Sequence, residues 1–284
     1  MKLVTYNTQY GVGRDGRFDL ERIAKEVEGA DIIALQEVTR NFARNGGVDM
    51  IDGLAALLSR YFYAFGPAMD LDFGATDKDG KPLNKRFQFG NMVLSRWPIA
   101  ASRNLLLPRT LRFSRGNLQR SALEALVLTP SGPIRIYSVH LDHISVAERT
   151  LQIVHLKERA SAYASEGGAI SGSAEYGFPE PPRPQGFILM GDFNMDRFSP
   201  EYMLMTGEQD AASREAGADP IDVYSLGGGL PNGAVSWVDD AKPETNRLID
   251  FAFVEKGLAG RVGKAWIDRE AKGSDHLPVW FELA

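Results

Sequence analysis

A carboxylate and an amide stand two residues apart at the end of an apolar run, in Gly191-Asp192-Phe193-Asn194 after residues 187–190. Side chains alternate along an extended chain, so Asp192 and Asn194 can point to the same side of a strand end. Metal or phosphate chemistry is one reason for such a pair to lie there. Taken alone, the tetrapeptide is equally compatible with a turn.

Other apolar runs in the chain end in the same kind of residue. Ligand sites in sheet proteins gather where strands end, because loops open there. Each residue alone can be a turn former, a helix cap or a hydrogen-bonded core group, but the repetition favours one shared site. The set comprises Asn7, Glu37, His140, Asp192, Asn194, Asp250 and Asp275-His276.

The acidic residues and the histidine suggest two chemical roles. Glu37, Asn7 and Asp275 offer hard oxygen ligands, which favour Mg²⁺ or Mn²⁺ over Zn²⁺. With 4 histidines and no cysteine, the composition argues against a structural zinc site. Asp250 on one ring nitrogen of His276 would fix the tautomer and raise the basicity of the other nitrogen, which makes a general base for a water.

Hydrogen-bond donors complete the set. His140 and Asn194 would donate to oxygens whose charge grows in a transition state. The sequence contains no Gly-rich loop of the NTPase type and no Gly-x-Ser-x-Gly elbow. A metal, a water base and oxyanion donors together describe hydrolysis at phosphorus better than hydrolysis at carbon.

The first ninety residues alternate between strands and helices. Periodicity predicts strands at 3–7 and 32–35, and helices at 20–27 and 50–58. Residues 66–89 read as a long polar stretch. Within it, Asp77-Lys78-Asp79-Gly80 lacks the glutamate and spacing of an EF-hand and predicts a tight turn.

From Gly90 onward the pattern becomes rich in strands. We expect strands at 91–95, 123–128, 134–140, 248–254 and 277–283, and a helix at 146–165. Residues 168–186 are rich in Gly, Ser and Pro, and predict a surface excursion of one domain spanning 1–284 rather than a linker, because site residues lie on both sides. The mixture favours an α/β or α+β fold with two β-layers.

Composition limits the classes of partner. The net charge of −5 and a pI near 5.5 indicate no broad basic surface for nucleic acid. No apolar stretch reaches the roughly 18 residues of a membrane span, no signal peptide is evident, and we expect no exposed apolar hairpin for membrane insertion. The absence of cysteine fits a reducing cytoplasm, which is the location we predict. No obligate protein partner is readable.

In this order the motifs resemble the endonuclease/exonuclease/phosphatase superfamily, the DNase I-like metal-dependent phosphoesterases. The resemblance covers almost the whole chain and implies a four-layer αββα sandwich with two mixed β-sheets and the site at one edge of them. The motifs are Thr5-Tyr6-Asn7, Leu35-Gln36-Glu37-Val38, residues 90–98, Val139-His140-Leu141-Asp142-His143, Gly191-Asp192-Phe193-Asn194, Arg247-Leu248-Ile249-Asp250-Phe251 and residues 274–279.

The resemblance also implies roles for the residues of the site. Glu37 looks like the principal metal ligand, assisted by Asn7 and Asp275. His276 looks like the base that activates water, paired with Asp250. The implied cofactor is Mg²⁺, with Mn²⁺ as a possible substitute.

Two further roles concern the nucleophile and the phosphate. By the resemblance, Asp192 would orient the nucleophile or share the role of base. Asn194 and His140 would bind the scissile phosphate. All these positions hold the expected residue, which argues against a degenerate, non-catalytic member.

On the substrate side the resemblance leaves alternatives open. Arg120 sits where relatives often place an arginine that contacts phosphate, or it forms a surface salt bridge. His143 could reach the substrate or cap the following helix. Trp237 could stack on a base or sugar, or anchor its loop against the core.

The leading hypothesis is a Mg²⁺-dependent phosphoester hydrolase whose substrate is a nucleic acid or a small phosphorylated metabolite. One alternative is a binding or scaffold protein that keeps the fold without turnover. A phospholipid phosphodiesterase is a further alternative.

Overall fold

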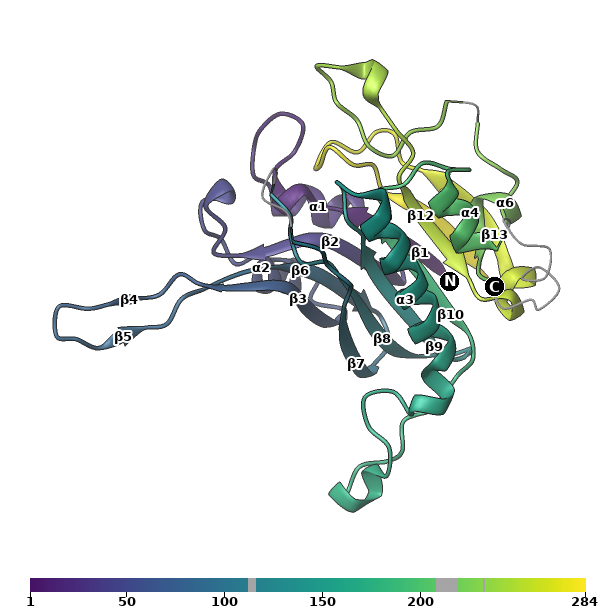
Figure 1. The fold of residues 1–284 in the computed structure, drawn as a ribbon, viewed down its shortest axis with the longest axis horizontal. Helices are drawn as coiled ribbons and strands as arrows, with labels where there is room; N and C mark the ends of the chain where they lie inside the picture. The colour runs from purple at the N-terminus through teal and green to yellow at the C-terminus, as the bar shows by residue number, and fades with distance from the viewer. Residues whose placement is uncertain (112–115, 208–218, 232) are drawn as a thin grey trace.

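Two six-stranded β-sheets pack face to face at the centre of the molecule (Figure 1). This computed structural model describes residues 1–111, 116–207, 219–231 and 233–284. The strands of each sheet include both parallel and antiparallel pairs. Helices lie outside the two sheets, so the αββα architecture predicted from the sequence is confirmed.

The first sheet holds both ends of the chain. Its strand order is β13 (Val262–Ile267), β14 (Val279–Leu283), β1 (Lys2–Asn7), β2 (Ile32–Arg40), β6 (Arg86–Ser95) and β3 (Phe62–Asp72). The second sheet has the order β11 (Ile221–Asp222), β12 (Asp250–Val254), β10 (Phe187–Asp192), β9 (Gly132–His140), β8 (Ser121–Thr129) and β7 (Ile99–Leu106).

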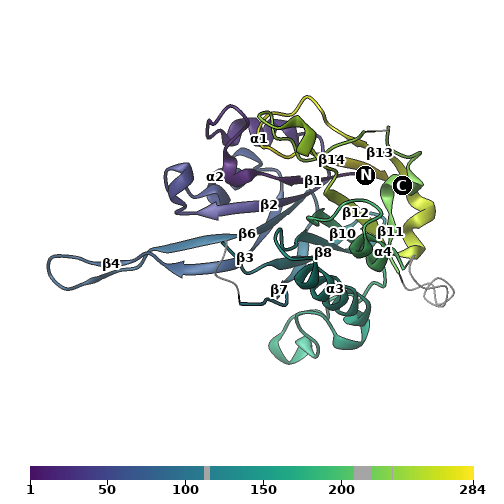
Figure 2. The same ribbon diagram turned by 45° about the horizontal axis from the view of Figure 1, so that its top comes forward.

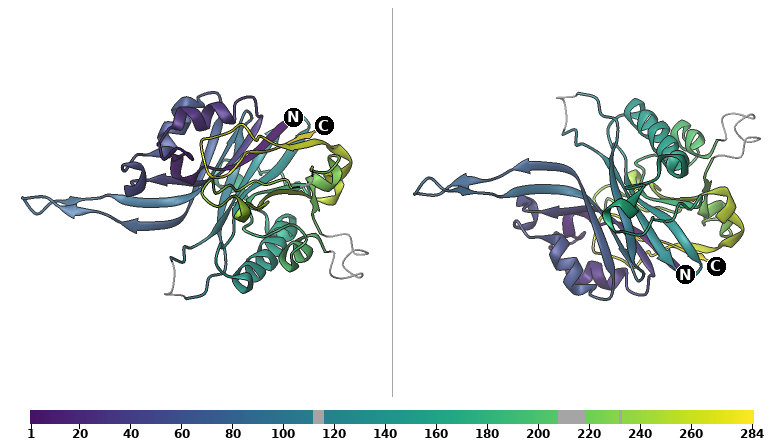
Figure 3. Two further views of the ribbon diagram at one scale, coloured as in Figure 1. Left: turned by 90° about the horizontal axis from the view of Figure 1, so that it is seen from above. Right: turned by 90° about the horizontal axis from the view of Figure 1, so that it is seen from below.

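Alternating side chains of the first sheet supply two separate cores. Leu3 and Ile32 face the second sheet, whereas their neighbours Val4 and Ile33 face the outer helices. The helices on the outer face of the first sheet are α1 (Leu20–Glu26) and α2 (Met50–Leu57). Helices α3 (Val146–Glu166) and α4 (Pro200–Thr206) lie on the opposite side of the molecule (Figure 3). Short elements are α6 (Val223–Leu226), η1 (Gln9–Gly11), η2 (Ala43–Asn45), η3 (Ser173–Tyr176), η4 (Pro243–Thr245) and η5 (Lys256–Arg261).

Polar side chains cross the apolar interface between the sheets. The Gln36 amide donates to the Ser138 hydroxyl over 2.8 Å. The Asn91 amide donates to the carbonyl oxygens of Ser121, at 2.9 Å, and Ser138, at 3.0 Å. Since these groups are buried, each bond satisfies atoms that no water can reach, and it fixes how the sheets face each other.

A long hairpin projects from one end of the molecule, where the sequence predicted only a polar stretch at 66–89 (Figure 2). Strands β3 and β6 continue outward and end in the small ladder of β4 (Ala75–Thr76) and β5 (Pro82–Leu83). The sequence did not reveal β3 and the outer part of this hairpin, because β3 is exposed or half-buried along most of its length and shows little apolar alternation. The tight turn at Asp77–Gly80 is confirmed, since the Gly80 N–H donates to the Asp77 carbonyl.

The hairpin also corrects the expectation about exposed apolar residues. Leu71, Phe73 and Leu83 lie near its tip and are each about half exposed. The sequence therefore does contain a hairpin that presents apolar side chains to the surroundings. Among the described residues, no helix has the length and apolar character needed to cross a membrane.

Several elements agree with the sequence and others were not expected. The helix at 146–165 is present as α3, which begins at its N-cap Ser145 and ends before Gly167. Strands β7 and β13 and the short helices α4 and α6 were not expected. Residues 168–186 connect α3 to β10 and carry η3 on a loop that extends away from the sheets (Figure 1).

Candidate active site

Three neighbouring strands of the second sheet bring three polar side chains into one row. Strand β10 pairs in parallel with β9 and antiparallel with β12. In these registers Asp192 lies opposite both His140 and Asp250. The strand ends predicted separately from the sequence therefore meet at one edge of the sheet.

Gly191 permits this pairing at the point where the site begins. A Cβ atom on Gly191 would lie 1.9 Å from the carbonyl oxygen of Val139 on the neighbouring strand, closer than any side chain allows. After the glycine, Asp192 Oδ1 accepts the N–H of Asn194 over 2.9 Å. Asn194 has a left-handed φ of +51°, and its side chain donates to the carbonyl of Leu141.

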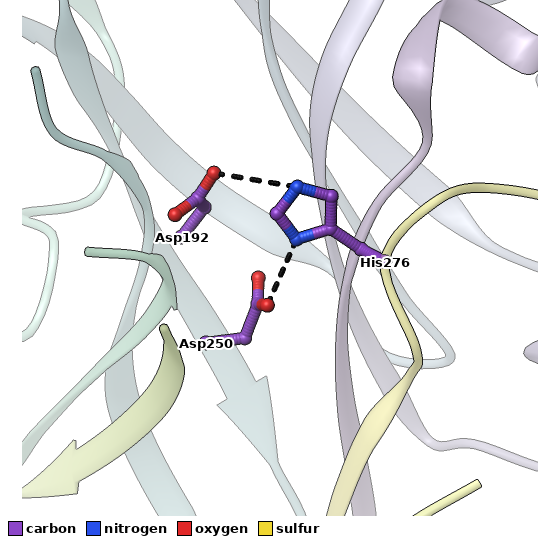
Figure 4. A group of neighbouring side chains, drawn as sticks. All are labelled: Asp192, Asp250 and His276. Carbon is purple, nitrogen blue, oxygen red and sulfur yellow. Dashed lines mark hydrogen bonds and ion pairs between the residues drawn. The ribbon is translucent and has the colours of Figure 1, made fainter. Parts of the chain in front are cut away.

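An aspartate holds the imidazole of the final motif (Figure 4). His276 Nδ1 lies 2.8 Å from Asp250 Oδ2, which also accepts the hydroxyl of Ser236 over 2.6 Å. The other ring nitrogen, Nε2, faces Asp192 Oδ2 at 3.8 Å. One nitrogen is therefore fixed by Asp250, and the other is available on the side of Asp192.

Burial and neighbouring charges shift the pKa values of both Asp192 and His276. Burial raises the pKa of Asp192 above its ordinary value. Burial by itself would lower the pKa of His276, but the carboxylates of Asp250 and Asp192 raise it overall. A positive charge placed in the adjoining pocket would oppose both upward shifts.

Glu37 reaches the same edge from the first sheet through a β-bulge. The register between β2 and β6 shifts between Leu35 and Val38, so two residues of β2 lie opposite one of β6. The first, Gln36, points between the sheets, and Glu37 has a left-handed φ of +58°. This uncommon backbone conformation turns the carboxylate of Glu37 towards the pocket rather than the core.

The carboxylates on this side fit a divalent cation. Burial and the charge of Asp275 raise the pKa of Glu37, so two acidic groups face each other with incomplete compensation. Hard carboxylate oxygens in this relation are the donors that Mg²⁺ and Mn²⁺ take. We expected Asn7 to supply a third oxygen ligand for the metal. Its amide nitrogen instead donates to Asp192 at 3.0 Å and to Glu37 at 3.4 Å. Its oxygen accepts the N–H of Gln9.

A second group of three residues also meets the distance condition for a metal. Ligand atoms of Asp192, Asp250 and His276 all lie within 4.8 Å of one another. Their hydrogen bonds favour a different interpretation, because Asp250 Oδ2 is already occupied by His276 and Ser236. The hydrogen bonds thus tie Asp250 to the imidazole of His276, and they leave Glu37 and Asp275 as the candidates for holding a cation.

A buried guanidinium lines the same pocket as the carboxylates. Arg120 donates from Nη1 to His140 Nε2 and from Nη2 to His143 Nδ1, both over 2.7 Å. In the described part of the chain its hydrogen-bond partners are these imidazoles and no carboxylate. Burial and the charge of Arg120 lower the pKa of His140, which keeps that ring neutral. A buried cation whose hydrogen-bond partners are imidazoles is suited to receiving an anion.

These contacts bear on the alternative roles predicted for Arg120, His143 and Trp237. Arg120 is only 3% exposed, so the surface salt bridge is wrong. His143 does not cap α3, since Ser145 does so, and its ring lines the pocket beside Arg120. Trp237 is half-buried, and its Nε1 donates to Asp275 Oδ2 over 3.0 Å. The indole is anchored to this carboxylate and also lines the pocket.

All these side chains surround or lie directly beneath one pocket of about 520 Å³. Sequence reasoning missed Ser236, which orients Asp250, and Arg247, which lines the pocket while paired with Asp196. It also missed an apolar side of the pocket. The residues there are Tyr10, Phe42, Met69, Phe87, Phe89 and Leu118. The only sequence feature that pointed to Ser236 was its position next to Trp237, and the only one that pointed to Arg247 was its place in the motif of Asp250.

Solved structures with the same fold include several enzymes. An endonuclease/exonuclease/phosphatase from Beutenbergia cavernae aligns over 100% of this chain and 72% of its own, with 21% identity and a TM-score of 0.71. A mannosyl-6-phosphatase from Bacteroides thetaiotaomicron aligns over 100% and 99%, with 20% identity and a TM-score of 0.64. The catalytic domain of human Nocturnin, with a bound sulfate anion, aligns over 100% and 94%, with 19% identity and a TM-score of 0.58.

A family model gives the more specific result. No curated protein matches the sequence. The model that describes the endonuclease/exonuclease/phosphatase family matches residues 4–276, from the first strand to the histidine of the final motif. That span contains all the strand-end residues described above. The chain belongs to the endonuclease/exonuclease/phosphatase family.

Proposed function

We propose that this protein is a metal-dependent hydrolase of phosphoesters. The observation that carries the proposal is the buried guanidinium of Arg120, which lines one pocket together with a cluster of carboxylates. A phosphate group bound between them would meet a cation on one side and a held imidazole on the other. That combination suits attack of water on phosphorus.

The phosphate would be bound by donors from the second sheet. Arg120 would transfer hydrogen bonds from the imidazole of His140 to the phosphoryl oxygens, because charged acceptors bind guanidinium more strongly than neutral rings do. Nε2 of His140, which also lies 3.3 Å from Asp192 Oδ2, would then carry a proton and act as a donor. Asn194 lines the same pocket and supplies an amide.

Proton transfer from water falls to Asp192 and His276. Because Nδ1 of His276 is held by Asp250, Nε2 is the atom that can take a proton. Asp192 lies beside it and would orient the water or share the proton. As the water oxygen bonds to phosphorus, the ester P–O bond breaks, and the leaving oxygen takes a proton from solvent to depart as the alcohol.

Glu37 and Asp275 would hold the divalent cation, for which we propose Mg²⁺, with Mn²⁺ as a substitute. When bound, such a cation neutralises charge on the phosphoryl oxygens and on the leaving oxygen. It would also offset the repulsion between the two carboxylates, which burial strengthens.

The test compares hydrolysis of an aryl phosphodiester and an aryl phosphomonoester with Mg²⁺, with Mn²⁺ and with a chelator. We expect turnover that requires a metal, and a fall in kcat of roughly 10²-fold or more in His276→Ala and in Asp192→Asn. His155→Ala is the matched control, because His155 lies on α3 and does not line the pocket.

Substantial turnover in both site variants would overturn the proposal. Stabilisation by metal without turnover on any phosphoester would instead support the alternative of a binding protein on the same fold. The control variant should retain wild-type activity in either case. A panel of DNA, RNA and phosphorylated metabolites would then identify the substrate.

A further inference from the structure

A row of aromatic rings lines the same pocket as the charged residues. Tyr10 meets Phe42 edge to face, with ring centroids 5.1 Å apart. Phe42 in turn stacks on Phe87 at 5.0 Å, with 17° between the ring planes. Tyr10, Phe42 and Phe87, which we call the aromatic wall, come from three separate segments of the first half of the chain.

The backbone holds part of this wall in an uncommon conformation. Gln9 and Tyr10 have φ values of +42° and +45°, in the left-handed region that residues with side chains rarely adopt. Arg44 lies over the Tyr10 ring, with Cζ 5.9 Å from its centroid, and it also lines the pocket. Strained residues beside an active site are consistent with a need to present a particular side chain there.

The surroundings of the wall extend its apolar character. Met69, Phe89 and Leu118 line the same pocket, and Phe89 lies next to His140 with ring centroids 6.2 Å apart. A phosphate bound by Arg120 would therefore share the pocket both with carboxylates and with an apolar surface. A polyhydroxylated alcohol would lose hydrogen bonds to water on such a surface, whereas a planar ring would gain contact area.

We infer that the aromatic wall determines specificity by binding a planar aromatic or heteroaromatic ring in the alcohol part of the substrate. The class is thus phosphoesters of ring-bearing alcohols, with sugar and inositol phosphates disfavoured. This inference rests on the proposed function for the position of the phosphate. It assigns Tyr10 and Phe42 as the residues that select the alcohol.

Phosphonates test the inference because their C–P bond resists hydrolysis, so binding is measured without turnover. Calorimetry in the presence of Mg²⁺ would compare 3-phenylpropylphosphonate with propylphosphonate, which carries the same anion without the ring. Stacking on aromatic side chains contributes roughly 1–3 kcal/mol per ring, so we expect about tenfold tighter binding of the phenyl compound.

Variants locate the preference on the wall. Phe42→Leu and Tyr10→Leu keep apolar volume while removing the ring, so they preserve folding better than alanine does. Each should reduce the preference for the phenyl compound several-fold and leave the affinity for propylphosphonate unchanged. Tyr176→Ala is the control, because Tyr176 is an exposed aromatic residue on η3 that does not line the pocket.

The outcomes separate the wall from the catalytic proposal. Equal binding of the two probes, or a preference that survives both variants, would overturn the inference and leave the phosphate site intact. Tighter binding of 3-cyclohexylpropylphosphonate or octylphosphonate than of the phenyl compound would also overturn it, in favour of a saturated or acyl chain. No binding of any probe would overturn the inference together with the anion site of the proposed function.

Discussion

Asp250 Oδ2 lies 2.8 Å from His276 Nδ1, and this contact determines which ring nitrogen faces the pocket. The two residues are 26 positions apart in the sequence. Asp250 begins β12 of the second sheet, and His276 lies in the loop before β14 of the first sheet. The Ser236 hydroxyl donates to the same carboxylate oxygen. The imidazole is therefore oriented by a carboxylate that is itself held in place.

Asp250→Asn should lower kcat by roughly 10²- to 10⁴-fold while leaving the fold intact. The amide has nearly the shape of the carboxylate, but it lacks the charge that stabilises a protonated His276. Steady-state kinetics at saturating metal would measure the effect, and circular dichroism would check folding. A loss of less than about threefold would mean that the Asp250 charge has no part in catalysis.

Glu37→Gln should separate metal binding from stability. Burial and Asp275 raise the pKa of Glu37, so removing this charge should raise Tm by roughly 2–4 °C in the presence of a chelator. The same change should weaken activation by Mg²⁺ by about tenfold or more. Thermal unfolding with and without metal, together with a Mg²⁺ titration of activity, would test both parts. A lower Tm in the chelator would contradict the assigned repulsion.

Arg120→Lys should weaken binding of phosphate groups. A lysine is a point charge and cannot reproduce the two-armed contact that Arg120 makes with His140 and His143. We expect kcat/KM to fall by roughly 10- to 100-fold and inhibition by inorganic phosphate to weaken in proportion. Arg96→Lys, a change in a partly exposed ion pair outside the pocket, serves as the control. Unchanged phosphate inhibition would exclude Arg120 from the anion site.

Gly191→Ala should reduce the free energy of unfolding by about 3 kcal/mol, because its Cβ would overlap the Val139 carbonyl of the paired strand. Urea denaturation would measure the change. Gly260→Ala is a matched control, since no atom lies within 4 Å of its added Cβ, and it should change the free energy by less than about 0.5 kcal/mol. Equal effects of the two substitutions would show that the close approach at Gly191 relaxes at little cost.

The tip of the hairpin should be dispensable for folding. Deleting residues 75–83 would leave four residues to connect Asp72 with its strand partner Arg86. Because the removed segment is exposed, Tm should change by less than about 2 °C. Differential scanning calorimetry would measure this. A large fall in Tm would indicate that the tip packs against the body.

Much of the site was predictable because it depends on strand ends. His140 and Asp192 each close an apolar run, Asp250 opens the antiparallel strand β12, and the sheet register places the three in one row. Their proximity follows from the pattern, whereas their catalytic roles stay predictions. Residues held by long-range pairing alone, such as Ser236, leave no periodic trace in the sequence.

Other features depend on geometry that periodicity does not encode. The bulge at Glu37 adds one residue to β2 and reverses the direction in which its side chain points. The outer half of the hairpin lacks a buried face, so it resembled a polar loop. The aromatic wall joins Tyr10, Phe42 and Phe87 from separate segments, and only the tertiary structure brings them together.

The amide of Asn91, which bonds to two carbonyl oxygens of the opposite sheet, sets the distance between the two halves of the site. Glu37 belongs to one sheet and Asp192 to the other, so a change in sheet separation moves the proposed cation ligand away from the residue that we propose orients the water. A misplacement of about 1 Å can cost roughly 10²-fold in rate. Substitutions at this remote interface would therefore impair the proposed hydrolysis without altering any group that touches the substrate.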